Sequence, residues 1–265
     1  MLKQRIITAL WLAPLVLLGL FWLDGGAFAL FTALIVLLAS WEWVNLAGCE
    51  GQRQRLLGAA AMALLMLVLW LAGAVHATWL LWLGVLGWLA NLYWVIHYPD
   101  KGAQWQATPR RLVMGLWVLL PCWVGFISLR DSGAVWLLFV LLLVWCADTG
   151  AYFAGRAFGR RKLAPRVSPG KSWEGVAGGL AATTLLALLF ATWQSLGLWQ
   201  GLALVVITWL VTLISVLGDL VESMLKRYRG IKDSSALLPG HGGVLDRIDS
   251  LTAAVPWFAL LGGWL

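Results

Sequence analysis

Long apolar runs dominate the chain and restrict what it can fold into. Hydrophobic residues make up 62% of the 265 positions, and only 12 residues are Asp or Glu. Runs such as Leu137 to Val144 are apolar at every position. They lack the alternation of apolar and polar residues that is typical of membrane β-strands. The sequence therefore predicts an all-α fold, a polytopic helical membrane protein.

At a minimum of about 20 residues per crossing, we expect nine transmembrane helices. They cover residues 6–23, 26–48, 56–74, 78–98, 112–129, 134–156, 175–196, 201–225 and 244–264. The first run follows Lys3 and Arg5, as in a signal peptide. It has no clear small-residue cleavage site, so we interpret it as a retained helix.

The basic residues are distributed asymmetrically between the two predicted sides of the membrane. The N-terminus and every second connection hold 18 of the 19 Lys and Arg residues, and the other side has only Arg130. By the positive-inside rule, this places the N-terminus in the cytoplasm. Loop anchoring and phosphate binding account for the net charge of +7, so nucleic acid is not an expected partner.

Charged residues are concentrated between residues 218 and 250. Five of the twelve acidic residues lie there: Asp219, Glu222, Asp233, Asp246 and Asp249. Asp219, Glu222, Ser223 and Lys226 have spacings that place them on one helical face. If the last span begins near Val244, Asp246 and Asp249 share a face of its first turns. Charge at a membrane boundary is costly, so this segment is the predicted functional site.

Asp148 adds a carboxylate near the inner end of the sixth span. Small neighbours such as Gly150 and Ala151 permit close helix packing or leave room for a ligand. The alternative is an ion pair with an arginine that only holds two helices together. Carboxylates ringed by Lys and Arg suit Mg²⁺ and phosphates. A softer metal would need Cys or His clusters, which the sequence lacks.

Two further features lie at predicted cytoplasmic boundaries. Gly170-Lys171-Ser172 looks like the end of a P-loop, but Pro165 replaces the required glycine and no strand precedes it, so we reject that motif. We expect Ser172 or a neighbour to cap the seventh span, with Lys171 and Arg166 facing an anion. Glu42 lies near the inner end of the second span. A functional role is open, but we interpret it as a boundary residue paired with an arginine.

The charged segment resembles the signature of bacterial phosphatidate cytidylyltransferases, the CDP-diacylglycerol synthases. The matching pattern is Ser223-x-Leu225-Lys226-Arg227-x4-Lys232-Asp233-x-Ser235-x2-Leu238-Pro239-x-His241-Gly242-Gly243-Val244-x-Asp246-Arg247-Ile248-Asp249. The resemblance extends to Ala147–Tyr152 and Ser168–Lys171, and more loosely to the whole chain.

The resemblance implies transfer of CMP from CTP to phosphatidate, giving CDP-diacylglycerol and pyrophosphate. It implies Mg²⁺ as cofactor and leaves room for a second cation. The expected localisation is the bacterial cytoplasmic membrane, with the active site facing the cytoplasm. A homodimer is left open. Residues 1–110 would form an N-terminal part with spans one to four. Residues 111–265 would form the catalytic part, with cytoplasmic loops at 156–174 and 226–243.

The implied roles fall into three groups. The expected catalytic residues are Asp219, Asp246, Lys226, His241 and Arg247. The expected substrate-binding residues are Lys171, Ser168, Arg227, Lys232, Gly242, Gly243 and Ser223. The expected metal-site carboxylates are Asp219, Asp246, Asp148, Asp249 and Glu222. Two alternatives remain, a transporter of an anionic metabolite and another CTP-using lipid enzyme such as a lipid kinase. The transporter is disfavoured because no inverted repeat is visible and the charge lies at one membrane face.

Overall fold

The structure, a computed structural model, describes residues 2–264. Helices account for most of this range, with one two-stranded antiparallel sheet. The α-helices are α1 (Leu2–Trp22), α2 (Gly25–Leu46), α3 (Gln52–Leu71), α4 (Thr78–Ile96), α5 (Thr108–Ser132), α6 (Ala134–Phe158), α7 (Trp173–Trp193), α8 (Leu198–Arg229) and α9 (Leu245–Leu261). Short 3-10 helices cover Ala74–His76, Gly102–Gln104 and Gly262–Trp264, and the strands are β1 (Lys162–Ala164) and β2 (Ser168–Ser172).

The all-α polytopic fold is confirmed, and each predicted span corresponds to one helix. Among the described residues, the seven helices α2 to α8 are long and apolar enough to cross a membrane. In α1, the segment Leu10–Trp22 is a shorter apolar stretch among the described residues. Helix α9 has 17 residues and continues into the 3-10 turn at Gly262–Trp264. A helix satisfies its backbone hydrogen bonds internally, which is what the hydrocarbon core requires.

The two predicted cytoplasmic loops are more structured than expected. Between α6 and α7 the chain forms the β1–β2 hairpin, with Lys162 opposite Ser172 and Ala164 opposite Ser168. Helix α8 continues to Arg229 and ends at Gly230, whose φ of +68° suits glycine. The last turn of α8 is basic, which stabilises the negative end of the helix dipole and explains why the helix outlasts its apolar run.

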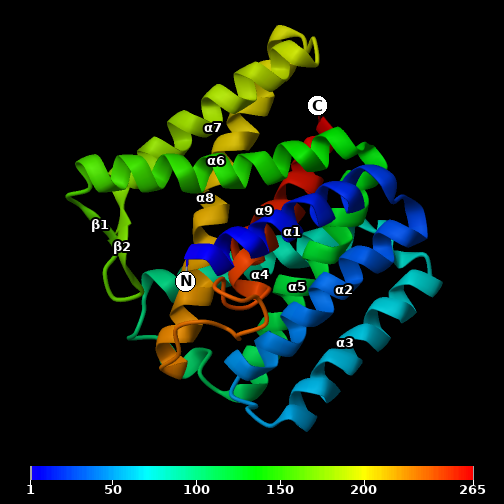
Figure 1. Cartoon of the computed structure of the whole chain (residues 1–265), viewed down its shortest axis with the longest axis vertical. Helices are drawn as coiled ribbons and strands as arrows, with labels where there is room; N and C mark the ends of the chain where they lie inside the picture. The colour runs from blue at the N-terminus through cyan, green and yellow to red at the C-terminus, as the bar shows by residue number, and fades with distance from the viewer. Residues whose placement is uncertain (1, 265) are drawn as a thin grey trace.

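Helix α5 lies at the centre of the bundle. Most of its side chains from Arg111 to Leu129 are buried, and it packs against α2, α4, α6 and α9. Helix α3 lies at the edge, with only Met62 and Met66 buried among its described residues. The hydrophobic core draws residues from both the 1–110 and the 111–265 segments. In Figure 1, α6 crosses α8 steeply, while α7 and the first half of α8 extend away from the other helices at the top.

Small residues bring α6 and α7 together, as the sequence predicts. A Cβ atom added to Gly150 would lie 2.6 Å from the Gly178 carbonyl oxygen, and one added to Gly179 would lie 3.0 Å from the Ala147 carbonyl oxygen. Such distances leave no room for a larger side chain. The small-residue faces are therefore used within one chain, and the homodimer stays a prediction with no surface assigned to it.

A second close approach joins α8 to α9. A Cβ atom on Gly218 would lie 2.5 Å from the carbonyl oxygen of Asp249 and 3.0 Å from Cα of Ser250. This contact brings the polar end of α8 against the first turns of α9. The charged residues that the sequence places on separate helices therefore meet at this crossing.

Candidate active site

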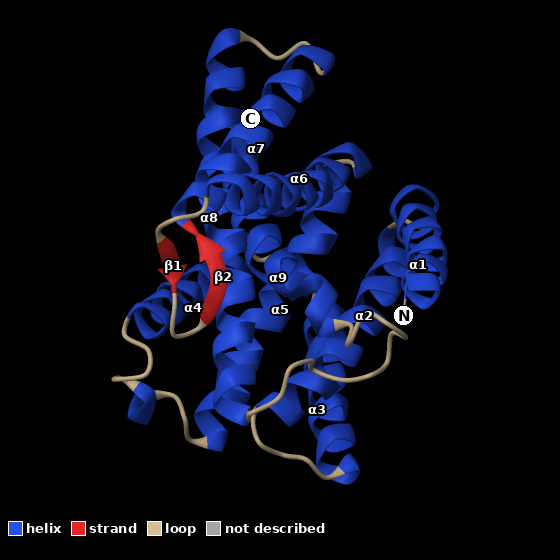
Figure 2. Cartoon of the chain, turned by 60° about the vertical axis from the view of Figure 1, so that its left-hand side comes forward, coloured by secondary structure: helices blue, strands red, loops and turns tan. Residues whose placement is uncertain are grey.

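The charged residues gather where α6, α8, α9 and the hairpin meet. Strand β2 supplies Lys171, and Figure 2 shows the hairpin lying beside α8. The Lys171 ammonium nitrogen lies 2.6 Å from Oδ2 of Asp219. The other Asp219 oxygen, Oδ1, accepts a hydrogen bond of 3.0 Å from the Ser223 hydroxyl one turn along α8. Asp219 is one-third exposed, so its carboxylate remains accessible to a ligand.

Asp246 forms a second lysine–carboxylate pair, deeper in the structure. The Lys226 ammonium nitrogen lies 2.7 Å from Oδ1 of Asp246 and 3.4 Å from Oε1 of Glu222. The other oxygen, Oδ2 of Asp246, accepts hydrogen bonds from the Ser234 and Gly243 backbone amides, at 2.9 and 2.7 Å. One side of Asp246 therefore holds the loop before α9, and the other side faces Lys226.

The other two predicted carboxylates belong to the same cluster. Asp148 on α6 interacts electrostatically with Lys171, Asp219 and Arg247. Asp249, one turn after Asp246, interacts with Asp219, Glu222 and Lys226. All five predicted carboxylates are thus brought together from three helices. The positive groups that face these carboxylates are Lys171, Lys226 and Arg247, and a further cation would lower the repulsion among the carboxylates.

The carboxylate oxygens of this cluster are donors of the kind that a hard divalent cation binds. Within residues 2–264, no three His, Cys, Asp or Glu side chains are already arranged around one metal position. Lys171 and Lys226 instead carry positive charge against Asp219 and Asp246. Both Glu222 oxygens are buried without a hydrogen-bond partner. The oxygen donors of Asp219 and Asp246, together with Glu222, whose 3.4 Å ion pair with Lys226 is its printed polar contact, match the ligand preference of Mg²⁺. Magnesium stays a prediction.

The predicted basic residues have different surroundings. Arg227 donates a 3.3 Å hydrogen bond from Nε to the Val167 carbonyl, so it also ties α8 to the hairpin that carries Ser168. Lys232 is exposed in the loop after α8. Arg247 is exposed on α9 and lies within electrostatic range of Asp148.

The glycine-rich loop before α9 has a backbone conformation that favours glycine at two positions. Gly240 and Gly242 have φ values of +78° and +85°, which glycine adopts without strain. Between them, His241 donates its backbone N–H to the Leu238 carbonyl at 2.8 Å, and its side-chain Nδ1 has no hydrogen-bond partner. An unsatisfied imidazole nitrogen is available to a ligand.

The start of α7 is only partly as predicted. The Ser172 hydroxyl accepts a 3.1 Å hydrogen bond from the Gly175 amide, which confirms the helix cap. Gly170, Lys171 and Ser172 lie in a strand, in agreement with the rejected P-loop. Lys171 and Arg166 pair with carboxylates, the latter with Asp100 at 3.7 Å between two exposed side chains. The expected anion site formed by these two residues is therefore not assembled in this conformation.

The interpretation of Glu42 as the partner of an arginine is wrong. Glu42 is completely buried, and its carboxylate accepts hydrogen bonds from the segment between residues 234 and 245. The nearby Arg55 stacks on Trp41, with its guanidinium carbon 3.2 Å from the ring centroid. Sequence reasoning also missed Ser234. The available signal was Glu42 itself, an acidic residue in an apolar helix.

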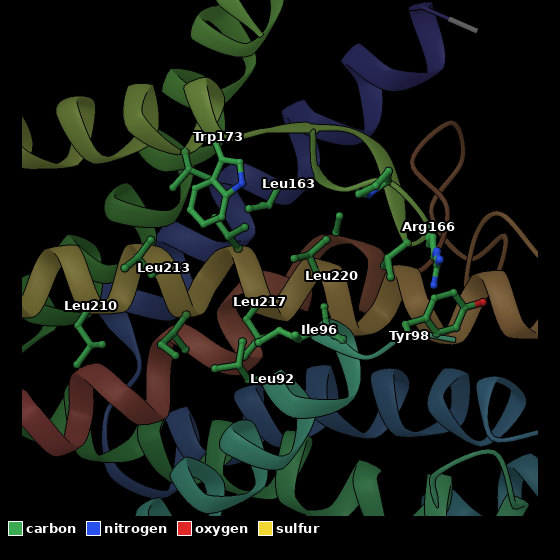
Figure 3. A pocket seen from close by; sticks show the side chains of 17 residues that line it. Leu92, Ile96, Tyr98, Leu163, Arg166, Trp173, Leu210, Leu213, Leu217 and Leu220 are labelled. Atoms are coloured by element: carbon green, nitrogen blue, oxygen red, sulfur yellow. The ribbon is translucent and has the colours of Figure 1, made fainter. Parts of the chain in front are cut away.

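An elongated apolar cavity of about 710 Å³ lies beside the charged cluster. Figure 3 shows Arg166 and Tyr98 at one end, Leu210 and Leu213 at the other, and Trp173 over the middle. The same hairpin segment supplies both the wall of this cavity and Lys171 of the cluster. A polar site and a cavity of apolar side chains are therefore joined through shared structural elements.

Comparison with known proteins gives the family. Residues 3–264 match the family described as "Cytidylyltransferase family". The "Phosphatidate cytidylyltransferase" of Pseudomonas aeruginosa is 52% identical over 275 residues, which cover 100% of this chain and 99% of the relative. The protein of the same name from Haemophilus influenzae is 43% identical, covering 98% of each chain. That from Brucella suis is 38% identical, covering 98% of this chain and 93% of the relative. This chain belongs to the cytidylyltransferase family, and it is an enzyme of that family.

Proposed function

We propose that this enzyme transfers CMP from CTP to phosphatidate. A phosphate oxygen of the lipid forms a bond to the α-phosphorus of CTP. The bond between that phosphorus and the oxygen bridging to the β-phosphorus breaks, and pyrophosphate leaves with the electron pair. The relatives named phosphatidate cytidylyltransferase support this substrate pair. The observation that carries the proposal is that a charged cluster and an apolar cavity share the β1–β2 hairpin and α8, because the reaction joins a polyanion to a lipid.

The residues of the cluster would act mainly by positioning and by charge neutralisation. Lys171 and Lys226 would exchange their carboxylate partners for phosphate oxygens, so that two polyanions can approach each other. Their carboxylates keep the ammonium groups in place before substrate arrives. His241 and the glycine-rich loop would contact the departing pyrophosphate. No side-chain nucleophile is needed, because the lipid phosphate supplies the attacking oxygen.

Mg²⁺ is part of the proposal. The residues that would hold it are Asp219 and Asp246, with Asp148, Glu222 and Asp249 as further ligands or supports. Once bound, the ion would neutralise charge on the phosphates during transfer. The protein's own contribution is to bring the carboxylates of α8 and α9 together at their crossing, where Gly218 allows the two helices to touch, with Asp148 added from α6.

A reaction with purified protein tests the substrate pair. With CTP, phosphatidate in detergent micelles and Mg²⁺, we expect pyrophosphate and the CDP-lipid in equal amounts. Diacylglycerol, which lacks the phosphate, should give no product. Product from diacylglycerol would identify a lipid kinase instead and would contradict the proposal.

The apolar cavity is the proposed position of an acyl chain of the lipid. An acyl chain gains no hydrophobic free energy on leaving the bilayer for the cavity, because both are apolar. Its benefit would be alignment of the head group with the charged cluster. Leu213→Trp should fill part of the cavity and lower kcat/KM for long-chain phosphatidate by about tenfold through misalignment.

A matched substitution serves as the control for the cavity. Leu86 is an exposed apolar residue of α4 outside the cavity lining. Leu86→Trp adds the same bulk and should leave kcat/KM within about twofold of the wild-type value, as expected for a site without a shared partner. Equal losses of kcat/KM in both variants would contradict a role of the cavity in binding the acyl chain.

We propose that the charged cluster faces the cytoplasm in a bacterial inner membrane. The 18-to-1 partition of basic residues supports this orientation. Figure 1 is consistent with it, since the α2–α3 connection and the hairpin lie towards the bottom and left, whereas the α7–α8 and α1–α2 connections lie towards the top and right.

Cysteine labelling tests the orientation. With the native Cys49, Cys122 and Cys146 replaced by Ala, single cysteines at the exposed positions Arg53 and Arg161 should react only from the cytoplasmic side. A cysteine at Ser132, also exposed, should react only from outside. A membrane-impermeant maleimide applied to intact cells and to inverted vesicles measures this. Labelling of position 161 in intact cells would overturn the topology.

A further inference from the structure

Glu42 connects the N-terminal half of the chain to the charged cluster. It lies on α2 with no exposed surface. One carboxylate oxygen, Oε1, accepts from the Ser235 hydroxyl at 2.5 Å and from the Val244 amide at 2.9 Å. The other, Oε2, accepts from the Leu245 amide at 2.6 Å and lies 3.2 Å from the Ser234 hydroxyl. A buried carboxylate that is satisfied so completely is strongly held.

The contacts of Glu42 include the N-terminus of α9. The first amides of a helix have no partner within the helix. In α9 the residue before the helix is Val244, whose side chain cannot cap it. Glu42 supplies that cap from α2, and its negative charge suits the positive end of the helix dipole. Because α9 begins at Leu245, this cap fixes the turn that carries Asp246.

Ser234 links Glu42 directly to Asp246. Its single hydroxyl proton lies between two carboxylates, with Oδ2 of Asp246 at 2.9 Å and Oε2 of Glu42 at 3.2 Å. One turn further along α2, the Asn45 side-chain amide donates to the Ser234 carbonyl at 3.4 Å. The loop before α9 is therefore held by α2 on one side and by Asp246 on the other.

Close packing around Gly243 shows how little freedom this arrangement leaves. A Cβ atom on Gly243 would overlap both the Ser234 hydroxyl and the Glu42 carboxylate. The loop can approach Glu42 only with hydrogen at this position. The Gly243 amide in turn donates to Oδ2 of Asp246.

We propose that Glu42 is a positioning residue of the active site. It fixes the loop from Ser234 to Leu245 and the start of α9, and through them it sets the direction in which Oδ1 of Asp246 faces Lys226. The expected effect of Glu42 on catalysis rests on the proposed function. It also makes the first part of the chain a contributor to a site whose predicted ligands all lie after residue 147.

Glu42→Gln tests the proposal with nearly unchanged shape. The new amide group would face donors on one side of the carboxylate, so at least one hydrogen bond must be lost. We expect kcat to fall by at least about tenfold, as misplacement of a reacting group predicts, while KM for CTP changes less than threefold. Amide exchange at Val244 and Leu245 should accelerate by at least about tenfold, with helices α3 and α6 unaffected.

Three single variants and one double variant complete the experiment. Glu50→Gln removes the same charge nearby, from an exposed residue paired with Arg229 at 2.7 Å, and should leave kcat and exchange unchanged. Ser235→Ala should cause a smaller loss of kcat, and adding it to Glu42→Gln should cause little more, since the partner is already lost. Glu42→Asp keeps the charge and should recover part of kcat.

Two results would overturn the role of Glu42. One is a folded Glu42→Gln enzyme with wild-type kcat and unchanged exchange at residues 244 and 245. The other is accelerated exchange throughout the protein, which would indicate general destabilisation. The amide-exchange measurement does not depend on catalysis. Absence of cytidylyltransferase activity in the wild-type enzyme would therefore count against the proposed function alone.

Discussion

Replacing Asp219 with Asn should lower kcat by at least about 10²-fold, comparable to the loss of one strong electrostatic contact in a transition state. Asp219 pairs with Lys171 at 2.6 Å and is one-third exposed. The substitution removes a charge while keeping the shape of the side chain and an acceptor for the Ser223 hydroxyl. Purified variants assayed at saturating CTP and phosphatidate measure the effect, with membrane abundance as the test of folding.

A control variant separates this role from a general effect of charge. Asp131 lies at the end of α5, half-exposed and paired with His76 at 3.3 Å. Asp131→Asn should leave kcat within about twofold of wild type, as for ordinary surface substitutions. A well-folded Asp219→Asn enzyme with wild-type kcat would remove Asp219 from the catalytic site.

Asp246→Asn should show an equal or larger loss, for two reasons. It removes the charge that faces Lys226, and it also disturbs the loop held by Oδ2. An asparagine can keep its oxygen towards the Ser234 and Gly243 amides only by turning its own amide group towards the Lys226 ammonium. Faster amide exchange in the loop should therefore accompany loss of activity in this variant, but not in Asp219→Asn.

Removal of divalent cations should abolish activity, and Mg²⁺ should restore it. The reason is the donor set: five carboxylates lie near the junction of α6, α8 and α9, and the three cysteines, Cys49, Cys122 and Cys146, are free. Hard oxygen ligands favour Mg²⁺ over Zn²⁺. Dialysis against EDTA followed by addition of MgCl₂ measures the reversal, and a zinc-selective chelator should have little effect.

The protein should remain folded without the metal. Lys171 and Lys226 neutralise Asp219 and Asp246 on their own, so chelation does not leave these carboxylates unpaired. A monodisperse elution profile and an unchanged helical circular dichroism spectrum in EDTA would agree with this. Full activity after exhaustive chelation would contradict the magnesium site.

Much of the fold could be predicted because a helix that crosses a membrane needs a long apolar sequence. Each crossing needs an apolar run, and the runs in this chain are separated by short charged or glycine-containing breaks. The start of α9 near Val244 followed from the length needed to cross. The β1–β2 hairpin and the last turn of α8 could not be predicted in this way, because they lie outside the apolar runs and depend on local pairing and on the helix dipole.

The carboxylate cluster could be predicted, whereas its scaffold could not. Acidic residues are so rare in this chain that Asp148, Asp219 and Asp246 stand out, and helical spacing puts them at one depth. The hydrogen bonds from Ser234, Val244 and Leu245 to Glu42 join residues about 200 positions apart. No local pattern encodes such a pairing. A single acidic residue in an apolar helix looks the same in the sequence whether it pairs with an arginine or caps a distant helix.

The fate of the individual phosphates of CTP tests the central claim most directly. Purified enzyme should be given phosphatidate, Mg²⁺ and CTP labelled either at the α-phosphorus or at the γ-phosphorus. The account predicts that the α-label enters the lipid fraction and that the γ-label appears only in pyrophosphate. Transfer of the γ-label to lipid, or incorporation of neither label, would contradict cytidylyl transfer by this enzyme.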